Sequence, residues 1–590
     1  MRRLLSLVLI LVAGAVRAER PSLPWQKWDP ALFDQAAKEN KYILLYMAAV
    51  WCHWCHVMEG TTYKDPVIKK TILEKFIPVR VDQDADPELS YRYENWGWPA
   101  TIMLDKDGNE IFKRRGYIPP ELFSKLLVAV IEDPSALPSY AAGAEVDPNA
   151  VALSTDRRSR MEALLLGNYD GEHGGFGESQ RFIHGDTLEW ALERSRPLQR
   201  NADIETWREI AAKTLSGARH LIDPVWGGMF QYSDTLDWSG PHYEKLMNIQ
   251  RDAMRTYVLT YKIGYDSGDL AAARDIGRWL MDFMRAPSGA FYTSQDADAG
   301  GLRGNAFYAK SDAERRAAPQ PPIDRNAYAR ENGWAIESLA ELYDATGERD
   351  LIDAARRAFD WILVNRRAPN GGFGHARASD DDTHLGDTLA VAEAALALYR
   401  STAERRYLSL AAELGDVIAR DHRDPAGGYR VRAPGPGARG VLAKPVKQLD
   451  ENVAATRLFN LLARNTTKPA FRAAAEHGMR YLIALAEDGL VVPGALLADR
   501  ELSREPAHVT IVGAKDDPVA RALYAAARAY PTRYLRIEWL DRREGPLPAA
   551  DIDYPEMPEA AAFACANGAC SVPVFAATDV HRIVAKVDDR

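Results

Sequence analysis

Cysteine is scarce in this chain, which has 590 residues but four cysteines. After the first twenty residues no apolar run reaches the roughly 18 residues that a membrane-spanning helix needs, so no span is expected in the remaining chain. Basic residues number 74 against 83 acidic ones, and they form no stripe interleaved with aromatics. The sequence therefore excludes the common nucleic-acid-binding classes and predicts no nucleic-acid partner.

The composition is that of a folded protein. Hydrophobic residues make up 47% and charged residues 27% of the chain, with a net charge of −9. A chain of this length exceeds what one hydrophobic core organises, so two to four domains are expected.

The first eighteen residues are typical of a signal peptide. Arg2-Arg3 precedes an apolar run from Leu4 to Val16, and the small residues Val16 and Ala18 flank Arg17 before the predicted cut. The run is short for a bilayer span, although an uncleaved N-terminal anchor stays open as the alternative. The signal peptide predicts a periplasmic or secreted protein, in which cysteine pairs can form disulfides.

Residues 19–140 alternate helical and strand patterns, which predicts an α/β domain with a mixed sheet. The motif Cys52-His53-Trp54-Cys55 follows the apolar run 42–47, so it is expected to begin a helix. Unpaired backbone N–H groups and the helix dipole would there favour the Cys52 thiolate. A protonated His53 would lower the Cys52 pKa further.

A metal site is the alternative for this motif. Cys52, His53, Cys55 and His56 offer four ligands in five residues. Adjacent ligands on one helical turn cannot all converge on a tetrahedral ion, and structural zinc sites usually take a second ligand pair from a distant segment. A redox pair without metal or cofactor is therefore favoured.

Residues 146–500 consist of long amphipathic helical segments separated by a recurring glycine-aromatic element. The element occurs six times, about every 60 residues when one insertion is allowed, which predicts six stacked helix pairs. Six pairs are what a closed all-α (α/α)6 toroid needs, and an open solenoid is the alternative. The aromatic residues of the element either stack on sugar rings or fill each repeat, of which the second is favoured.

Residues 501–590 predict a small α/β extension that carries the second cysteine pair, Cys565/Cys570. Asn567-Gly568 is a strong signal for a two-residue hairpin turn, which places Ala566 opposite Ala569 and Cys565 opposite Cys570. The Cα atoms of such a pair approach to about 4.5 Å, within the range that a disulfide tolerates. This disulfide is expected either to be structural or to exchange with Cys52.

Polar residues in the predicted toroid loops form a candidate cleft at one rim. Two carboxylates across a cleft can hydrolyse a glycoside, and a histidine can transfer protons at a sugar carbon, as in an epimerase. The same acidic residues can instead cap helices or order loops. The residues are His242, Glu244, Gln295, Asp296, Asp298, Asp381, Asp387 and Glu451.

Residues 25–137 resemble a thioredoxin fold, on the evidence of the CxxC motif, of Trp51 and of Trp98-Pro99 at the head of a later strand. The resemblance implies that Pro99 is the cis-proline facing the cysteines. Thioredoxin has a buried acid six residues before its first cysteine. This chain has Tyr46 there, which puts efficient dithiol reduction in question.

Nearly the whole chain resembles the YyaL-like and spermatogenesis-associated protein 20-like family. The motifs are the segments 52–59, 174–177, 241–245 and 294–298 and the terminal cysteine pair. The resemblance implies a thioredoxin-like domain joined to a six-hairpin glycosidase-like toroid. The chain departs from the family at Asp450-Glu451-Asn452 and at the cluster 380–382, which lacks the usual tyrosine.

These features together predict an exported thiol–disulfide oxidoreductase in which Cys52 attacks and Cys55 resolves, with His53 and Pro99 shaping the site. The expected partner is a thiol- or disulfide-containing protein, and the toroid would select that partner or bind a carbohydrate. One alternative is a carbohydrate-active hydrolase or epimerase with the thioredoxin-like domain as scaffold. Another is a non-enzymatic carbohydrate-binding or assembly protein.

Overall fold

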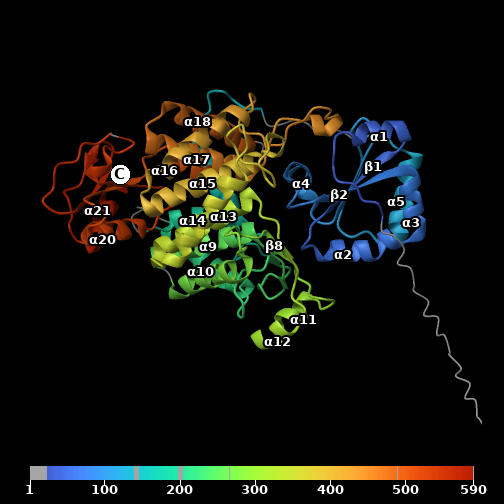
Figure 1. The fold of residues 1–590 in the computed structure, drawn as a ribbon, viewed down its shortest axis with the longest axis horizontal. Coiled ribbons are helices and arrows are strands. Elements are labelled where there is room, and N and C mark those ends of the chain that lie inside the picture. The colour runs from blue at the N-terminus through green and yellow to red at the C-terminus, as the bar shows by residue number, and fades with distance from the viewer. Residues whose placement is uncertain are drawn as a thin grey trace, which may run out of the picture.

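The computed structural model describes residues 23–137, 145–196, 203–264, 266–487, 489–549 and 551–588. Three units follow one another along the long axis of the molecule (Figure 1): an α/β unit, a helical body and a smaller α/β unit. The predicted signal peptide, residues 1–18, lies outside the described residues. Within them, no helix has the length and apolar character needed to cross a bilayer.

The N-terminal unit is built on a four-stranded sheet in the order β2-β1-β3-β4. β1 is parallel to β2 and antiparallel to β3, which is antiparallel to β4. Its strands are β1 (Tyr42–Ala48), β2 (Phe76–Asp82), β3 (Ala100–Leu104) and β4 (Glu110–Arg115). Its helices are α1 (Leu32–Glu39), α2 (His53–Gly60), α3 (Pro66–Lys75), α4 (Pro87–Tyr93) and α5 (Pro120–Glu132). Because β1 is a buried central strand, the motif that follows it is held at a fixed edge of the sheet.

The helical body is a closed toroid with an inner and an outer ring of helices. Each inner helix contacts the next, and α19 contacts α7, so the inner ring closes; α18 contacts α6 in the outer ring. The inner helices are α7 (Gly185–Arg194), α9 (Met247–Ile263), α13 (Ala329–Thr346), α15 (Leu385–Thr402), α17 (Leu449–Thr466) and α19 (Pro493–Leu502). The outer helices are α6 (Thr155–Gly167), α8 (Ile204–Ala218), α10 (Ser267–Trp279), α14 (Arg349–Asn365), α16 (Arg405–Asp421) and α18 (Pro469–Glu487). The predicted (α/α)6 fold is confirmed, and α6 and α19 from opposite ends of the body complete the sixth pair.

Three of the six glycine-containing elements are fixed by amide side chains from the inner helices. Asn332 of α13 accepts from the backbone N–H of Phe291 and donates to its carbonyl, and Asn452 of α17 does the same for Tyr429. Gln250 of α9 holds Met229 in the same way. Phe291 and Tyr429 are fully buried. These aromatic side chains therefore fill the interior of the repeats.

The C-terminal unit has the same sheet topology as the N-terminal one. Its order is β11-β10-β12-β13, with β10 parallel to β11 and antiparallel to β12. Its strands are β10 (Ala507–Val512), β11 (Leu535–Leu540), β12 (Ala561–Ala566) and β13 (Ala569–Cys570), and its helices are α20 (Pro518–Arg528) and α21 (Ala577–Asp588). With α20 between the parallel strands and α21 after the hairpin, the unit has a thioredoxin-like βαβ-ββα arrangement.

Short elements line the end of the toroid that faces the N-terminal unit. A three-stranded sheet joins β7, β8 and β9, and β5 pairs with β6. These elements are β5 (Tyr232–Ser233), β6 (Pro241–His242), β7 (Lys245–Leu246), β8 (Ser294–Gln295), β9 (Ile323–Asp324), α11 (Gly304–Tyr308) and α12 (Asp312–Ala317). They carry several of the predicted cleft residues toward the thioredoxin-like unit.

Candidate functional site

The CxxC motif begins helix α2 and is oxidised. Cys52 and Cys55 form a disulfide with a Cα–Cα distance of 5.2 Å. Cys52 is the N-cap of α2, and its Sγ accepts a hydrogen bond from the backbone N–H of Cys55 at 3.1 Å. The Trp98–Pro99 peptide bond is cis, as the resemblance to thioredoxin implied. An N-cap sulfur that already accepts a backbone N–H is placed to be stabilised as a thiolate after reduction.

Tyr46 does not replace the buried acid of thioredoxin in function. Its hydroxyl donates to the carbonyl of Cys55 at 2.9 Å. Burial holds the pKa of this phenol far above its ordinary value, so the side chain stays neutral at physiological pH. Tyr46 fixes the position of Cys55 and provides no base for it.

The disulfide faces the toroid and is covered by it. Cys52 is 3% exposed. Leu246 and Ile249, at the start of α9, belong to the hydrophobic cluster that contains Trp51 and both motif cysteines. A protein substrate therefore cannot reach the Cys52 sulfur while the two units are in contact.

Both histidines of the motif contact acidic residues of the toroid loop that follows β8. His53 Nδ1 lies 2.5 Å from Oδ2 of Asp298, and His56 Nδ1 lies 3.7 Å from Oδ2 of Asp296. The backbone N–H of Asp298 donates to Asp296, so the two carboxylates form one rigid loop. The redox motif and the predicted cleft acids therefore make one composite site across two units.

Glu244 lies behind these two aspartates. Burial raises the pKa of its carboxyl to about 7, and the charges of Asp296 and Asp298 add to the increase. Its Oε2 atom is buried without a hydrogen-bond partner and lies 3.9 Å from Nδ1 of His242. Near neutral pH this carboxyl can gain or lose a proton next to the redox motif.

A second contact lies at the loop after β2. The Asp84 carboxyl accepts hydrogen bonds at its Oδ2 from the Trp51 indole at 3.0 Å and from the Ser294 hydroxyl at 3.2 Å. Burial raises the pKa of Asp84 to about 8, with further increases from neighbouring acids. This side chain connects the residue before the motif to strand β8 of the toroid.

His375 holds the same loop from the toroid side. Its Nε2 lies 2.6 Å from the backbone carbonyl of Asp84, and its Nδ1 lies 2.9 Å from Oδ1 of Asp387. Burial alone would lower the pKa of His375, but the Asp387 carboxylate outweighs it and the pKa is raised. A protonated imidazole can donate to both partners, so His375 fixes the position of the two units.

Comparison with known proteins shows a family for the N-terminal unit. Residues 16–132 match the model of Thioredox_DsbH, described as a protein of unknown function, DUF255. The chain carries a DUF255 domain. The predicted similarity to spermatogenesis-associated protein 20 is confirmed. The Mus musculus protein is 27% identical over 311 residues, which cover 48% of this chain and 39% of that protein. The Homo sapiens protein is 26% identical with the same coverage. The chain thus matches under half the length of these curated relatives.

Solved structures resemble separate parts of the chain. A D-mannose isomerase is 13% identical with a TM-score of 0.45, covering 60% of this chain and 99% of its own. A cellobiose 2-epimerase from Bacillus thermoamylovorans is 11% identical with a TM-score of 0.42, covering 55% and 85%. A thioredoxin from Thermus thermophilus is 26% identical with a TM-score of 0.18, covering 19% and 88%. The assignment of the toroid rests on its closed ring of helices.

The toroid interior holds two adjoining cavities. One of about 420 Å³ is lined by inner helices and reaches Arg533 of the C-terminal unit. The other, of about 240 Å³, extends to Tyr91 and Glu94 of the DUF255 domain. Both are lined by Arg251 and Asp252. The DUF255 domain and the C-terminal unit therefore cover opposite ends of one interior space.

Glu451 lies in the smaller cavity and keeps its place among the cleft candidates. Burial raises the pKa of its carboxyl to about 8, against the opposing charge of Arg330. Both carboxylate oxygens are buried without a hydrogen-bond partner. An acid of this kind is poised to donate a hydrogen bond or a proton to a small polar guest.

The remaining predicted cleft residues have local roles. Gln295 is buried and accepts from the Trp279 indole at 3.2 Å. His242 stacks on Tyr232 and pairs with Asp234 at 3.0 Å. Asp381 is exposed and pairs with Arg377 of its own loop. Among the described residues, none of these three side chains forms a hydrogen bond or an ion pair with the redox motif.

Several residues of the interface escaped sequence reasoning, namely Asp84, Tyr91, Arg330 and His375. Arg330 donates to the Tyr91 hydroxyl at 2.5 Å, and so joins the toroid to α4. The acidic segment 82–86 directly after a buried strand was a visible signal for a site at the sheet edge. Within the described residues there is no group of three His, Cys, Asp or Glu side chains that could hold a metal ion.

Proposed function

We propose that the protein is a thiol–disulfide oxidoreductase whose reactive pair is Cys52/Cys55. The observation that carries the proposal is the disulfide at the N-cap of α2, with the Cys55 backbone N–H donating to the Cys52 sulfur. The cis-proline next to the motif supports it. Cys52 would form the mixed disulfide with a substrate protein, and Cys55 would break it by attacking the Cys52 sulfur.

In this proposed function, the toroid controls the access of substrate to Cys52. Because Cys52 is buried in a hydrophobic cluster to which the toroid contributes Leu246 and Ile249, exchange requires the DUF255 domain to move away from the toroid mouth. The contacts that must break include His53–Asp298, His56–Asp296 and His375–Asp84, together with the hydrogen bonds Ser294–Asp84 and Arg330–Tyr91. A partner that binds the toroid rim in place of the motif would expose the disulfide, so the toroid would select the substrate.

Export is part of the same proposal. A signal peptide over residues 1–18 would deliver the chain to the periplasm or the medium, where thiol–disulfide exchange with other exported proteins is useful. N-terminal sequencing of the protein recovered from its native host tests this. A mature chain beginning at Glu19 supports the cleaved signal peptide, and an intact Met1 contradicts its cleavage.

The activity test is disulfide reduction of insulin, with reduced glutathione as electron source. The Cys565→Ser/Cys570→Ser variant should retain activity, and Cys52→Ser in that background should remove it. Retention of the full rate in Cys52→Ser, or no activity in the chain whose N-terminal pair is intact, contradicts the proposal. Cys52→Ser and its parent should have matching melting temperatures in reducing buffer, which separates chemistry from folding.

A second candidate function is binding of a small polyhydroxyl molecule such as a sugar in the 240 Å³ cavity. The specific observation is Glu451, a buried carboxyl with a raised pKa and two unpartnered oxygens that line this cavity. Trp334 is also in the lining, where its ring packs against the guanidinium groups of Arg330 and Arg251. Calorimetry with a panel of mono- and disaccharides should show binding that Glu451→Gln weakens. Glu487→Gln, at the exposed end of α18, is the control.

A further inference from the structure

The hairpin disulfide of the C-terminal unit is asymmetric in its exposure. Cys565 on β12 and Cys570 on β13 are joined, with a Cα–Cα distance of 4.1 Å. Cys565 is 1% exposed, whereas Cys570 lies on the exposed edge strand β13. An incoming thiolate can therefore reach the sulfur of Cys570, and Cys565 would be the buried leaving group.

A chain of buried polar groups leads away from Cys565. The hydroxyl of Tyr554 lies 3.7 Å from its Sγ and 2.7 Å from Oγ1 of Thr510. Thr510 Oγ1 lies 3.1 Å from Nε2 of His508. The same nitrogen lies 2.7 Å from the carboxylate of Glu538, which is fully buried. The leaving sulfur thus contacts a connected series of groups that can carry a proton.

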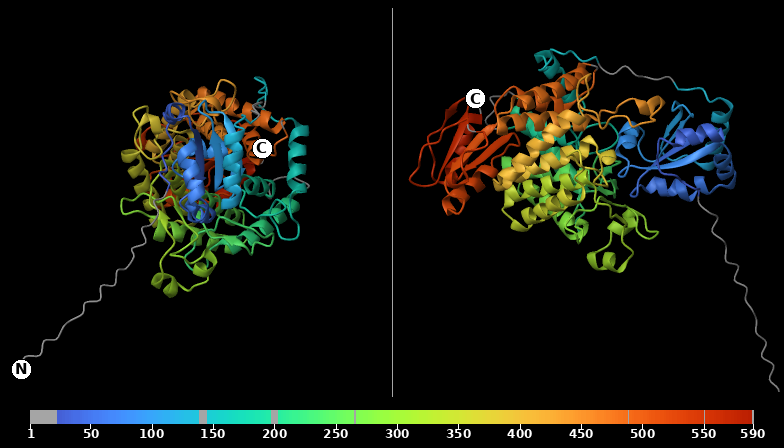
Figure 2. Two further views of the ribbon diagram at one scale, coloured as in Figure 1. Left: turned by 90° about the vertical axis from the view of Figure 1, so that its right-hand side faces the viewer. Right: turned by 45° about the horizontal axis from the view of Figure 1, so that its top comes forward.

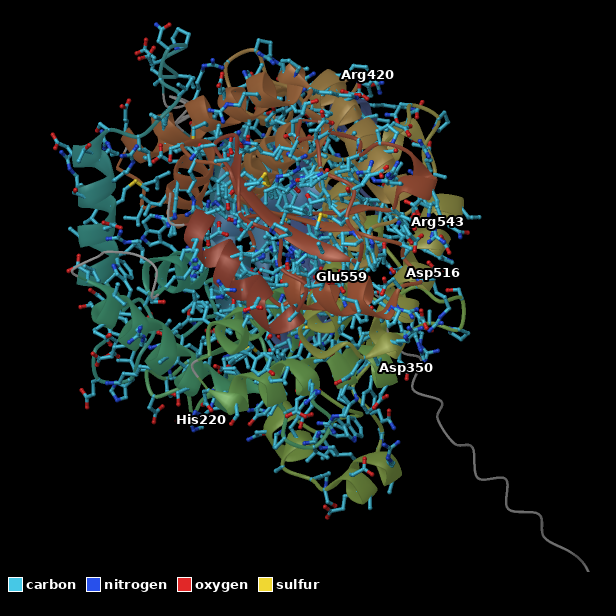
Figure 3. The ribbon with its side chains drawn as sticks, turned by 90° about the vertical axis from the view of Figure 1, so that its left-hand side faces the viewer. His220, Asp350, Arg420, Asp516, Arg543 and Glu559 are labelled. Atoms are coloured by element: carbon cyan, nitrogen blue, oxygen red, sulfur yellow. A yellow bond between two sulfur atoms is a disulfide. The ribbon has the colours of Figure 1, made fainter. Side chains whose placement is uncertain are left out.

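In the C-terminal unit, the position that corresponds to the redox motif of a thioredoxin-like fold has no cysteine. The N-cap of α20 is Asp517, where the N-cap of α2 is Cys52. Asp516 beside it forms an ion pair with Arg543 at the surface, 2.7 Å apart (Figure 3). Ala560 precedes β12, where Pro99 precedes β3. Any thiol chemistry of this unit must therefore come from the hairpin.

The disulfide contributes little to the stability of the hairpin. It closes a loop with a sequence separation of 5, and short loops return the least stabilisation from cross-linking. The turn is already set by Asn567 and Gly568, both with positive φ. Glu505 accepts the Asn567 N–H at 2.7 Å, and Ser571 N–H donates to the Ala564 carbonyl at 2.8 Å.

We propose that Cys565/Cys570 is a second redox site, which exchanges electrons with a dithiol protein of the thioredoxin class. In the forward direction the hairpin disulfide is reduced and the partner dithiol is oxidised. The partner's first thiolate attacks Sγ of Cys570, the Cys565–Cys570 bond breaks, and its electron pair leaves on Cys565. Cys565 takes a proton from the Tyr554 hydroxyl, which Thr510 and His508 resupply. The partner's second thiolate then attacks the partner's first sulfur, and Cys570 leaves and takes a proton from solvent.

The sequence transfers two electrons from the partner dithiol to the hairpin pair. The hairpin sulfurs take one proton from the Tyr554 chain and one from solvent, and the partner thiols release two protons to solvent when they form the attacking thiolates. The reverse sequence oxidises the hairpin and reduces the partner. The N-terminal unit lies at the opposite end of the molecule (Figure 2), so Cys52 of the same chain is not the partner. Exchange between the two cysteine pairs of one chain would require these two units to come together, and it is not part of this proposal.

The test uses the full chain with Cys52→Ser and Cys55→Ser, so that the hairpin pair is the only disulfide. Reduced thioredoxin lacking its second cysteine is the probe, and the mixed disulfide is mapped by mass spectrometry without reduction. We expect the probe on Cys570. A probe on Cys565, or no mixed disulfide under conditions in which the probe reacts with insulin, overturns the proposal.

The proton chain is tested by the rate of reduction with intact reduced thioredoxin. Tyr554→Phe should slow reduction at least about tenfold and change its pH profile, because a positioned proton donor is lost. Tyr524→Phe is the control, since it removes another buried hydroxyl of the same unit, which donates to the Arg400 carbonyl at 2.7 Å. Equal rates and pH profiles in the two variants assign Tyr554 a structural role and overturn the proton chain.

Discussion

Asp298 of the toroid and His53 of the redox motif form a hydrogen bond of 2.5 Å across the boundary between two units. Their side chains are each about one quarter exposed, 25% for His53 and 26% for Asp298. The other oxygen of Asp298 accepts the backbone N–H of Gly304 at 3.0 Å, which fixes the carboxylate before it meets the histidine. The interface thus holds the imidazole inside the CxxC motif in one orientation.

Weakening this hydrogen bond should open the redox site. Asp298→Asn keeps the size of the side chain but removes the charge, which should destabilise the closed arrangement by about 1–2 kcal/mol. After reduction, Cys52 should react several-fold faster with a bulky polyethylene glycol maleimide. Asp350→Asn, at an exposed position of α14 (Figure 3), should leave the labelling rate unchanged. Equal labelling of both variants would show that Asp298 does not gate access.

The mouth of the toroid should lose stability as the pH rises through neutrality. Burial raises the pKa of Glu244 to about 7 from its ordinary value of 4.5. A raised carboxyl pKa means that its contribution is fully present below about pH 4.5 and declines as pH rises through about 7, by about 3 kcal/mol in total.

Glu244→Gln should remove this part of the pH dependence, because the amide does not titrate. The measurement is the free energy of unfolding by urea at several values between pH 5 and pH 8, for the variant and the wild type. Glu172→Gln, on a highly exposed loop position, is the control and should follow the wild type. A difference between Glu244→Gln and the wild type that is constant with pH would contradict the assignment.

The sequence predicted the local parts of this structure well. The strand–CxxC–helix order, the cis-proline and the hairpin set by Asn567-Gly568 depend on residues close together in the chain, and the structure has each of them. The six-fold glycine-aromatic spacing predicted the number of helix pairs. Closure of the ring follows from contacts of α19 with α7, which no local pattern encodes.

The composite site could not be predicted, because it depends on how two units meet. His53 and Asp298 are separated by 245 positions in the chain, and Asp84 and His375 by 291. Sequence reasoning named Asp296 and Asp298 as sugar-cleft acids, and the structure brings them to the imidazoles of the redox motif instead. The amide side chains that hold the repeats were missed, since an asparagine in a helix has no distinctive pattern.

Removing one of these amides should be strongly destabilising. Asn452 of α17 accepts from Tyr429 N–H and donates to the carbonyls of Tyr429 and of Gln448, the N-cap of the same helix. Asn452→Ala leaves these groups unpaired and should reduce the free energy of unfolding by about 2–4 kcal/mol. Asn365→Ala, which removes one hydrogen bond to the Trp361 carbonyl at a helix end, should cost under about 1 kcal/mol. Thermal and urea unfolding of both variants checks the difference.

Asp84 should behave as a neutral group at physiological pH. Burial raises its pKa to about 8, so the carboxyl is mainly protonated at pH 7 while it accepts from the Trp51 indole and the Ser294 hydroxyl. Asp84→Asn should therefore change stability by under about 1 kcal/mol at pH 7, since an amide oxygen can accept the same bonds.

Asp84→Ala should cost about 2–3 kcal/mol at the same pH, because it leaves the buried indole N–H unpaired. The raised pKa of Asp84 also determines how the free energy of unfolding changes with pH. The wild-type value declines as pH rises through about 8, and Asp84→Asn should not share that decline. Urea unfolding at pH 6, 7, 8 and 9 measures both effects. If Asp84→Asn were as damaging as Asp84→Ala at pH 7, the carboxyl would have to be ionised there, and the contact between the motif and the toroid would depend on its charge.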